Sequence, residues 1–395
     1  MIYKDFEGEK LSQLGFGTMR LPTLSDKTID EKTTAEMVDV AISNGVNYFD
    51  TAWPYHGGAS ELVVGKILSD YDRKSFNLAT KYPGHQTMEK YDPAEIFEQQ
   101  LKKCRVDYFD YYLLHNICEN SIETYKNKKW GILEYFKEQK ANGRIRHLGF
   151  SSHARAELLK EILEIFGEDM EFCQIQLNYL DYTLQNAKAK CDMLNSYGIP
   201  IWVMEPVRGG KLATLAPDAE AALKSARPDE SVPAWAFRWL QGVPGVTMIL
   251  SGMSNMDQMK DNLKTFEAEK PLTAAEVEII LGIAEKMKNS LPCTACRYCV
   301  EGCPAGLDIP MMIAAYNDLR FVPGSYTVHM QMDSLTEDKL PSACIGCGAC
   351  SRICPQGIDI PKAMSELAVE VAKFPKWAAI CKERELANKK ANAKP

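Results

Sequence analysis

The sequence lacks the features that would place it in several large classes of protein. Its 395 residues contain no apolar run near the roughly 18 residues that a membrane-spanning helix requires, so we expect no membrane association. Basic residues do not outnumber acidic ones, and the formal net charge of -7 gives no electrostatic footprint for nucleic acid. The first ten residues carry acidic side chains where a signal peptide has its apolar core, which predicts a cytoplasmic protein.

Strand and helix patterns alternate over roughly the first 285 residues. Strands are expected at residues 14–19, 48–52, 77–82, 109–115, 147–152, 172–178, 201–205 and 246–251, and helices at 33–43, 60–68, 93–104, 132–141, 155–166, 183–197 and 273–288. Eight strand-helix units in about 250 residues favour a closed parallel (β/α)8 TIM barrel over an open Rossmann sheet. No Gly-x-Gly-x-x-Gly motif follows the first strand, which also argues against the open sheet.

Eight of the 13 cysteines form an internal repeat. Each copy reads Cys-x-x-Cys-x-x-Cys-x-x-x-Cys-Pro, which is typical of [4Fe-4S] ligation in which the fourth cysteine serves the other cluster. We therefore expect two [4Fe-4S] clusters, one bound by Cys293, Cys296, Cys299 and Cys354 and the other by Cys344, Cys347, Cys350 and Cys303. Zinc or disulfides are the alternatives, but zinc sites usually pair two Cys-x-x-Cys turns across a longer loop, and disulfides are rare in the cytoplasm.

The repeat divides the chain into an α/β part and a smaller one. We place the barrel at residues 1–288, a mainly helical, ferredoxin-like iron-sulfur domain at 289–375 and a tail at 376–395. Residues 382–395 of this tail are rich in lysine and alanine, so we expect them to be solvated and frayed. The five cysteines outside the repeat are expected to be buried thiols, and four histidines to lie at the surface or in loops: Cys104, Cys118, Cys173, Cys191, Cys381, His56, His85, His153 and His329.

Four reactive side chains lie at or just beyond the carboxyl ends of three consecutive predicted strands: Asp50, Tyr55, Lys81 and His115. The carboxyl ends of neighbouring barrel strands share one face, so these side chains should converge in one cleft. There Tyr55 would act as a general acid, its pKa lowered by the adjacent Lys81 ammonium. Asp50 would keep Lys81 protonated through an ion pair, and His115 would direct a ring N–H at a carbonyl oxygen.

The barrel half resembles the aldo-keto reductase family over about residues 1–285. The matching pieces are Leu-Gly-Phe-Gly-Thr-Met at 14–19, Phe-Asp-Thr-Ala at 49–52 followed by Tyr55, Ala-Thr-Lys at 79–81, Leu-Leu-His at 113–115, Arg-Ile-Arg-His-Leu-Gly-Phe-Ser-Ser at 144–152 and Gln-Ile-Gln-Leu-Asn at 174–178. The cysteine-rich half resembles dicluster ferredoxin domains fused to redox enzymes, over about residues 292–372.

The resemblance implies a nicotinamide cofactor, NADP(H) or NAD(H), extended across the barrel mouth. The cofactor-binding residues that it implies are Gly17, Thr18, Asp50, Ser151, Ser152, Gln174, Met204, Pro206, Gly209, Gly210, Gly252, Ser254, Gln258 and Asn262, of which Ser151, Ser152 and Gln174 would hold the carboxamide. Met204 replaces the stacking tyrosine of many members, so stacking would be weaker. The loop at residues 252–258 lacks the Lys and Arg that some members place on the 2'-phosphate, which makes NADH a real option.

The favoured hypothesis is an oxidoreductase that reduces an aldehyde or ketone to an alcohol, or the reverse, with NAD(P)(H) and with Tyr55 as the general acid or base. Its clusters would transfer electrons or support the structure, and its partners would be a small carbonyl or alcohol substrate and a redox protein. Hydride transfer moves two electrons at once, whereas a cluster normally exchanges one, so direct coupling between the nicotinamide and the clusters is chemically awkward. Two alternative functions therefore stay open. These are a ferredoxin- or flavin-linked enzyme on the same scaffold and a non-catalytic, redox-sensing module that binds nicotinamide.

Overall fold

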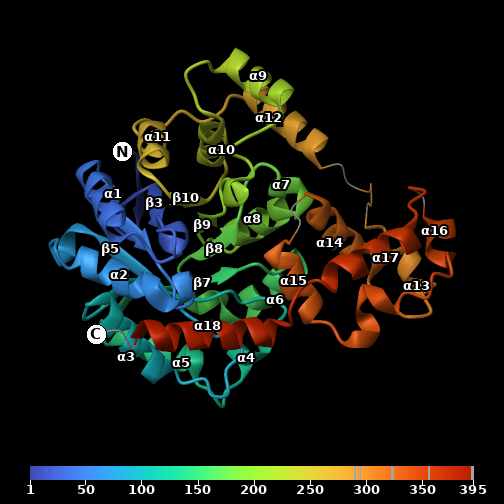
Figure 1. Cartoon of the computed structure of the whole chain (residues 1–395), viewed down its shortest axis with the longest axis horizontal. Helices are drawn as coiled ribbons and strands as arrows, with labels where there is room; N and C mark the ends of the chain where they lie inside the picture. The colour runs from blue at the N-terminus through green and yellow to red at the C-terminus, as the bar shows by residue number, and fades with distance from the viewer. Residues whose placement is uncertain (289–290, 292, 294, 322–323, 355, 393–395) are drawn as a thin grey trace.

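The barrel predicted from the sequence is present in the computed structural model, which describes residues 1–288, 291, 293, 295–321, 324–354 and 356–392 (Figure 1). Its parallel strands are β3 (Leu14–Gly17), β4 (Tyr48–Asp50), β5 (Asn77–Tyr82), β6 (Phe109–Leu114), β7 (Ile145–Ser152), β8 (Cys173–Gln176), β9 (Ile201–Met204) and β10 (Val246–Gly252). They pair in chain order, and β10 pairs with β3 to close the barrel. The prediction of an eight-stranded closed barrel is confirmed.

An N-terminal hairpin, which the sequence patterns did not reveal, fills one end of the barrel. Strands β1 (Tyr3–Phe6) and β2 (Glu9–Ser12) pair antiparallel. Phe6 packs edge-on against Trp202 with 4.9 Å between ring centroids, and both belong to the cluster that occupies the barrel interior. Trp202 lies near the start of β9, so the hairpin closes the amino-terminal end. The carboxyl ends of the strands are left as the side on which a site can form.

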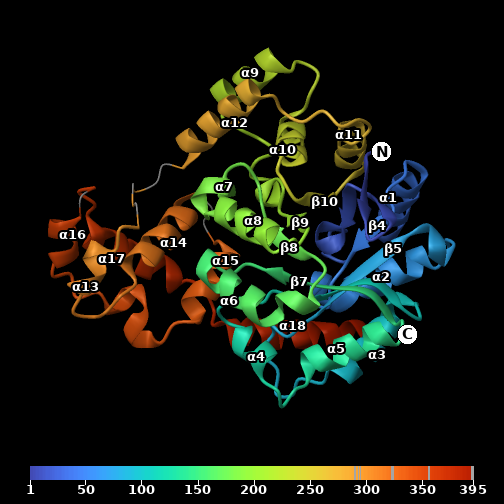
Figure 2. The same cartoon turned by 180° about the vertical axis from the view of Figure 1, so that it is seen from behind.

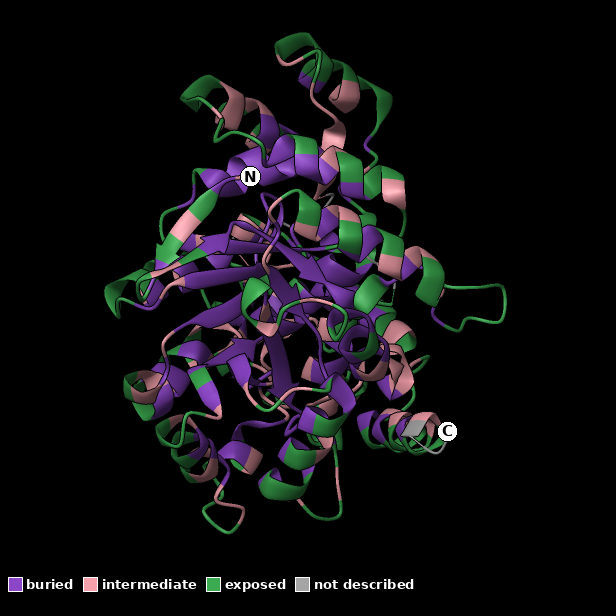
Figure 3. Cartoon of the chain, turned by 90° about the vertical axis from the view of Figure 1, so that its left-hand side faces the viewer, coloured by how far each residue is buried: buried purple, intermediate pink, exposed green. Residues whose placement is uncertain are grey.

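Helices surround the strands and bury both faces of the sheet, which is why the strands read as continuous apolar runs. They are α1 (Glu31–Ser43), α2 (Ala59–Leu68), α3 (Pro93–Cys104), α4 (Ile122–Lys126), α5 (Ile132–Ala141), α6 (Ala156–Phe166), α7 (Asp181–Leu184), α8 (Ala187–Ser196), α9 (Pro217–Ala226), α10 (Val232–Gln241), α11 (Met256–Thr265) and α12 (Ala274–Met287). In Figure 3 the strands are buried and the outward faces of the helices exposed. The single helix predicted at residues 183–197 is two helices, because Asn186 adopts a left-handed conformation (φ 52°) between them.

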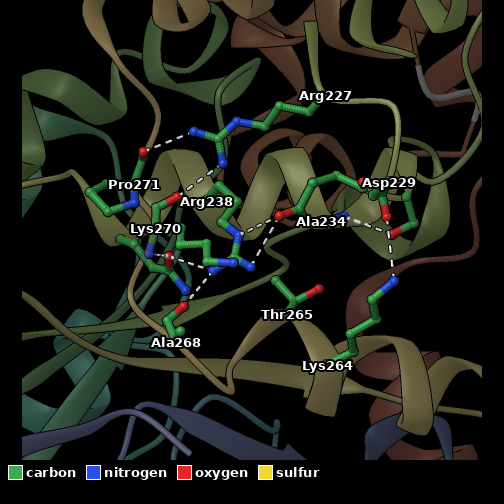
Figure 4. Close-up of polar contacts among 12 residues, drawn as sticks. Arg227, Asp229, Ala234, Arg238, Lys264, Thr265, Ala268, Lys270 and Pro271 are labelled. Carbon is green, nitrogen blue, oxygen red and sulfur yellow. Dashed lines mark hydrogen bonds and ion pairs between the residues drawn. The ribbon is translucent and has the colours of Figure 1, made fainter.

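Two arginines fix the segment that joins α11 to the closing helix α12 (Figure 4). Arg227 donates hydrogen bonds to the backbone carbonyls of Lys270 and Pro271, each at 3.1 Å. Arg238 donates to the carbonyl of Ala268 at 2.6 Å. These contacts satisfy backbone groups of a connection that has no regular structure of its own.

The second domain is mainly helical, as predicted, and lies to one side of the barrel (Figures 1 and 2). Its helices are α13 (Tyr298–Glu301), α14 (Ile309–Phe321), α15 (Tyr326–Asp333), α16 (Ala349–Ile353) and α17 (Ile360–Val371). In each cysteine repeat a short helix precedes a long one, and the long helices α14 and α17 share a core that includes Met312 and Met364. The predicted boundary falls at residues 289 and 290, which lie outside the described residues.

The prediction of a solvated, frayed end is wrong for residues 382–392. These residues belong to the helix α18 (Trp377–Asn392), which returns to the barrel and runs alongside it in Figures 1 and 2. Its Trp377, Cys381 and Asn388 are only 3%, 2% and 3% exposed. None of the helices in the described part of the chain is both long and apolar enough to cross a membrane.

Candidate functional site

Asp50 and Lys81 form a buried ion pair at the carboxyl end of the barrel. Asp50 ends β4, and Lys81 is the penultimate residue of β5. The Lys81 ammonium lies 2.6 Å from Asp50 Oδ1 and donates a second hydrogen bond to the carbonyl of Thr51 at 2.7 Å. Asp50 Oδ2 is buried and accepts no hydrogen bond from the described residues. The two hydrogen bonds of Lys81 define the geometry of the ion pair, and the second carboxylate oxygen of Asp50 has no hydrogen-bond donor among the described residues.

Tyr55 lies beside this pair, in a short 3-10 turn, η2 (Tyr55–Gly58), that follows β4. The Lys81 ammonium lies 5.0 Å from the centroid of the Tyr55 ring. The ring of His115, one residue beyond β6, faces the Tyr55 ring edge-on with 6.1 Å between centroids. Tyr55 and His115 are half-buried, whereas Lys81 and Asp50 are buried. The structure thus brings together all four residues singled out in the sequence.

The electrostatics of Tyr55 differ from the expectation that Lys81 lowers its pKa. Burial, followed by the negative charges of Asp50 and Glu205, raises the pKa of Tyr55 well above its usual value. The physical reason is that the Lys81 ammonium is already paired with Asp50, so little net positive charge reaches the phenol. Burial lowers the pKa of Lys81, although Asp50 acts in the opposite direction. The phenol is therefore protonated at neutral pH, which is the state that an acid requires.

His115 belongs to a pair of histidines. Burial, and then the charges of His85 and Lys81, lower the pKa of His115 well below 6.5. The His85 ring lies edge-on to it with 4.3 Å between centroids, and burial lowers the pKa of His85 to about 3. Both rings are neutral near pH 7. The expectation of a surface or loop position is wrong for His329, which is buried in α15, whereas His85 does lie in the turn after β5 but is only 6% exposed.

The buried histidines predict how stability depends on pH. An unfolded histidine titrates near pH ~6.5, so below that pH the unfolded chain binds protons that folded His85 does not. This contribution to stability is fully present above about pH 6.5 and is lost as the pH falls toward 3. We expect the melting temperature of the holoprotein to drop between pH 7.5 and 5.5, and to drop less in His85→Gln. Equal slopes for the two proteins in calorimetry would contradict this assignment.

Residues of the second domain and of α18, the helix that follows it, reach the same mouth of the barrel. The Trp377 indole N–H donates to the carbonyl of His85 at 3.0 Å. The Asn116 side chain, which follows His115, donates to the sulfur of Met330 in α15 at 3.2 Å. The Arg384 guanidinium lies 5.1 Å from the centroid of the Tyr326 ring. Sequence reasoning missed these residues because they match no motif, and each barrel partner is more than 200 residues away in the chain.

The predicted carboxamide residues lie side by side on two neighbouring strands: Ser151 and Ser152 end β7, and Gln174 of β8 is paired with Ser151. Gln174 Oε1 is buried and accepts no hydrogen bond from the described residues, so it could accept one from an amide N–H. The Ser151 hydroxyl oxygen accepts from the Asn116 backbone N–H at 2.8 Å and keeps its own proton to donate. The Ser152 hydroxyl already makes two hydrogen bonds within the protein: it donates to the carbonyl of Ile117 at 2.7 Å and accepts from the Ala154 N–H at 3.0 Å. Gln174 and Ser151 therefore fit a nicotinamide carboxamide.

The loop after β10 is shaped by the polar residues predicted to bind cofactor there. Gln258 accepts a hydrogen bond from the Ser254 backbone N–H at 2.8 Å. The Asn262 amide donates to the Ser251 hydroxyl at 2.8 Å. Because these side chains hold the loop itself, their contact with a cofactor remains a prediction.

Arg20, which the sequence did not single out, lies between the segments at residues 206–211 and 252–262, which contain the predicted cofactor-binding residues that follow β9 and β10. It follows β3, in η1 (Thr18–Arg20). A Cβ atom at Gly209 would lie 2.8 Å from Arg20 Nη2, and one at Gly252 would lie 3.2 Å from Arg20 Cβ. Arg20 is exposed, and the Ser254 hydroxyl donates to its carbonyl at 2.9 Å. Arg208 in the first segment is already paired with Asp181 and Asp318, so exposed Arg20 is a candidate for a phosphate contact.

The loop after β9 is tied to the second domain through Arg208. Its guanidinium pairs with Asp181 at 2.9 Å and with Asp318 of α14, and it lies 5.0 Å from the centroid of the Phe321 ring. Arg208 is 5% exposed. The iron-sulfur domain therefore holds one of the two loops predicted to bind the cofactor.

The eight cysteines of the repeat line two pockets in the second domain. One is lined by Cys344, Cys347, Cys350 and Cys303, and the other by Cys293, Cys296, Cys299 and Cys354. Each cavity thus combines three cysteines of one repeat with the fourth of the other, which is the exchanged arrangement expected from the spacing. No three His, Cys, Asp or Glu side chains of the described residues are grouped to hold a single metal ion, whereas these cages suit a polynuclear cluster. The other five cysteines are buried, as predicted.

Comparison with protein families gives two matches in the order expected from the sequence. Residues 13–285 match the model of the aldo/keto reductase family, and residues 292–358 match the model of a 4Fe-4S dicluster domain. The first match covers more than half of the chain. The two matches correspond to the barrel and to the cysteine-rich domain.

Individual relatives extend over the barrel. An uncharacterized oxidoreductase of Bacillus subtilis (strain 168) is 26% identical over 303 residues, which are 68% of this chain and 92% of that protein. The NADH-specific methylglyoxal reductase of Escherichia coli (strain K12) is 23% identical over 325 residues, which are 71% of this chain and 96% of that protein. Among solved structures, an aldo-keto reductase from Bacillus halodurans in its holo form matches with 28% identity and a TM-score of 0.58, covering 72% of this chain and 96% of that one.

Proposed function

Because this chain belongs to the aldo/keto reductase family and carries a 4Fe-4S dicluster domain after its barrel, we propose that it reduces the carbonyl group of a small molecule with a nicotinamide cofactor, or runs the reverse oxidation. The single observation that carries this proposal is the group of Tyr55, Lys81, Asp50 and His115 at the barrel mouth. Each member has a distinct chemical task. We further propose that the protein works in the cytoplasm, where thiols stay reduced.

The barrel residues bind the substrate carbonyl and transfer the proton that the reduction requires. When bound, the nicotinamide supplies or accepts the hydride. Tyr55, protonated at neutral pH, gives its proton to the carbonyl oxygen as negative charge develops there. Neutral His115 donates a ring N–H to the same oxygen and helps to orient the substrate. The Lys81–Asp50 pair lies beside the Tyr55 ring, with the ammonium 5.0 Å from the ring centroid, and helps to fix the position of the phenol.

The cysteine cages would hold two [4Fe-4S] clusters. We propose that the clusters serve an accessory role, in structure or in electron transfer with a redox partner protein. Hydride transfer moves two electrons whereas a cluster of this kind normally moves one, so the barrel chemistry does not require them. Loss of cluster redox activity should then leave nicotinamide-dependent turnover in place.

NADH is the favoured cofactor, because the loop at residues 252–258 contains no Lys or Arg for a 2'-phosphate. The related enzyme of Escherichia coli is described as NADH-specific. Arg20 would then contact the pyrophosphate that both forms of the cofactor share. It would hold the cofactor without distinguishing NADH from NADPH.

Arg20→Gln should weaken NADH binding. Loss of a charge-assisted hydrogen bond of about 1.5–3 kcal/mol corresponds to roughly a 10- to 100-fold rise in Kd. Fluorescence titration of NADH would measure it, with Lys32→Gln on the exposed side of α1 as the matched control. An unchanged Kd for Arg20→Gln would remove Arg20 from the cofactor site.

The function is tested by anaerobic purification followed by a visible spectrum, cofactor extraction and NADH oxidation with a panel of aldehydes and ketones. Cluster absorption without flavin, together with carbonyl-dependent NADH oxidation, would support the proposal. A flavin in the extract, or turnover only with reduced ferredoxin, would favour an electron-transfer enzyme. Tight NADH binding with no turnover would favour a redox-sensing module.

A further inference from the structure

Arg384 of α18 is a half-buried cation without a carboxylate partner among the described residues. Its guanidinium packs against two rings, at 5.1 Å from the Tyr326 centroid and 5.2 Å from the Trp377 centroid. Burial raises the pKa of the Tyr326 hydroxyl, and the positive charge of Arg384 acts against that rise. A guanidinium carries five N–H donors, and contacts with two ring faces leave its capacity for charge-assisted hydrogen bonds unused.

The acidic residues closest in sequence do not supply the missing charge. Glu383 and Glu385 adjoin Arg384, but neighbouring positions on a helix point in different directions. Glu385 instead pairs with Lys389 at 2.7 Å. Burial, and to a smaller extent the negative charge of Asp333 in α15, raises the pKa of Cys381, which lies one helical turn before Arg384 on α18. Asp333 forms no ion pair with Arg384 itself. The Arg384 guanidinium is therefore able to pair with an anionic ligand.

A continuous series of ring contacts links Arg384 to the proposed acid. Trp377 packs against His85 with 6.2 Å between centroids, His85 against His115 with 4.3 Å, and His115 against Tyr55 with 6.1 Å. The charge of Arg384 also contributes to the lowered pKa of both histidines, which means that it acts on the barrel mouth itself. The nearer cation, Lys81, is already neutralised by Asp50.

We propose that Arg384 binds the carboxylate of an anionic carbonyl substrate, such as a short oxo acid, while its carbonyl group lies between Tyr55 and His115. This inference rests on the proposed function and adds the substrate class. Arginine suits the role because its planar donor pair matches a carboxylate in a two-bond geometry, and the flanking Tyr326 and Trp377 rings hold the plane in place. Helix α18, which follows the second domain, then supplies part of the substrate site of the barrel.

Kinetics on the full-length holoprotein test the proposal. Glyoxylate and pyruvate are compared with the neutral methylglyoxal, using the wild type, Arg384→Gln and the control Lys382→Gln, which changes an exposed cation on the same helix. We expect Arg384→Gln to lower kcat/KM for the oxo acids about 10- to 100-fold, mainly through KM, and to change methylglyoxal less than about 3-fold. Equal losses on both substrate classes, or no loss, would overturn the assignment.

A binding measurement keeps the test independent of turnover and of how the variant folds. Oxamate carries a carboxylate, whereas oxamide is its neutral counterpart. In the wild type, tryptophan fluorescence should respond to oxamate and not to oxamide, because Trp377 adjoins Arg384. An equal response to both, or to neither, would contradict a carboxylate site. If methylglyoxal is reduced but no oxo acid is, the proposed function stands and this inference fails; if no carbonyl compound is reduced, the proposed function itself fails.

Discussion

Replacing Tyr55 with phenylalanine should reduce kcat for carbonyl reduction by about 10²- to 10⁴-fold, the usual contribution of a positioned general acid. The variant removes one oxygen atom and keeps the ring that contacts the Lys81 ammonium and the His115 ring. The Kd for NADH should therefore change little, because the loss falls on a proton that moves only during the reaction. Stopped-flow measurement of NADH oxidation at saturating substrate would separate this step from binding.

Tyr71→Phe is the matched control, since its hydroxyl makes an exposed hydrogen bond to Asp39 at 3.2 Å, away from the barrel mouth. It should retain wild-type turnover. If Tyr55→Phe kept more than about a tenth of the wild-type kcat, another group would be the acid. The roles assigned to Lys81, Asp50 and His115 would then be wrong as well, because each is defined by its relation to Tyr55.

The barrel could be predicted from the sequence because its strands are buried on both faces and read as apolar runs at regular spacing. The N-terminal hairpin could not, since its strands have only four residues each and its role depends on Phe6 reaching the distant Trp202. Helix α18 was misjudged for a different reason. Its many lysines suggested a solvated end, whereas its few buried residues, Trp377, Cys381 and Asn388, determine where it docks.

The candidate site was predictable to the extent that strand ends converge. Asp50, Lys81 and His115 are placed by their strands, and Tyr55 by the turn that follows β4. The sign of the Tyr55 pKa shift was not predictable, because it depends on a balance between burial and charges that only the assembled site defines. Contributions from far along the chain, such as Arg384 and Trp377, carry no local signal at all.

Polar contacts hold the C-terminal part of the chain against the barrel. Arg208 joins a cofactor loop to Asp318 in α14. Asn388 of α18 accepts a hydrogen bond from Lys103 at 2.9 Å, and Lys103 lies 3.7 Å from the centroid of the Trp53 ring, two residues before Tyr55. The iron-sulfur domain and the helix α18 that follows it thus contact the barrel at two separate places. A change in this C-terminal part of the chain can reach both the cofactor loop and the turn that carries Tyr55.

Cys303→Ala should remove one cluster and leave the other, so that the chain retains about four of about eight iron atoms. The reason is that Cys303 lines the cavity of Cys344, Cys347 and Cys350, whereas its own repeat completes its cage with Cys354. Iron and sulfide analysis with the visible spectrum would measure the loss. Cys118→Ala, which changes a buried cysteine of the barrel, is the control and should keep the full iron content.

Double variants decide whether the fourth ligands are exchanged between the repeats. With exchange, Cys303→Ala and Cys347→Ala damage the same cluster, so the combination should still retain about four iron atoms. Cys303→Ala with Cys296→Ala should damage both clusters and leave almost none. Without exchange the two combinations would give the opposite results. Since each cluster would join both repeats, loss of either one should also loosen the packing of α14 against α17 and, through Asp318, the cofactor loop at Arg208.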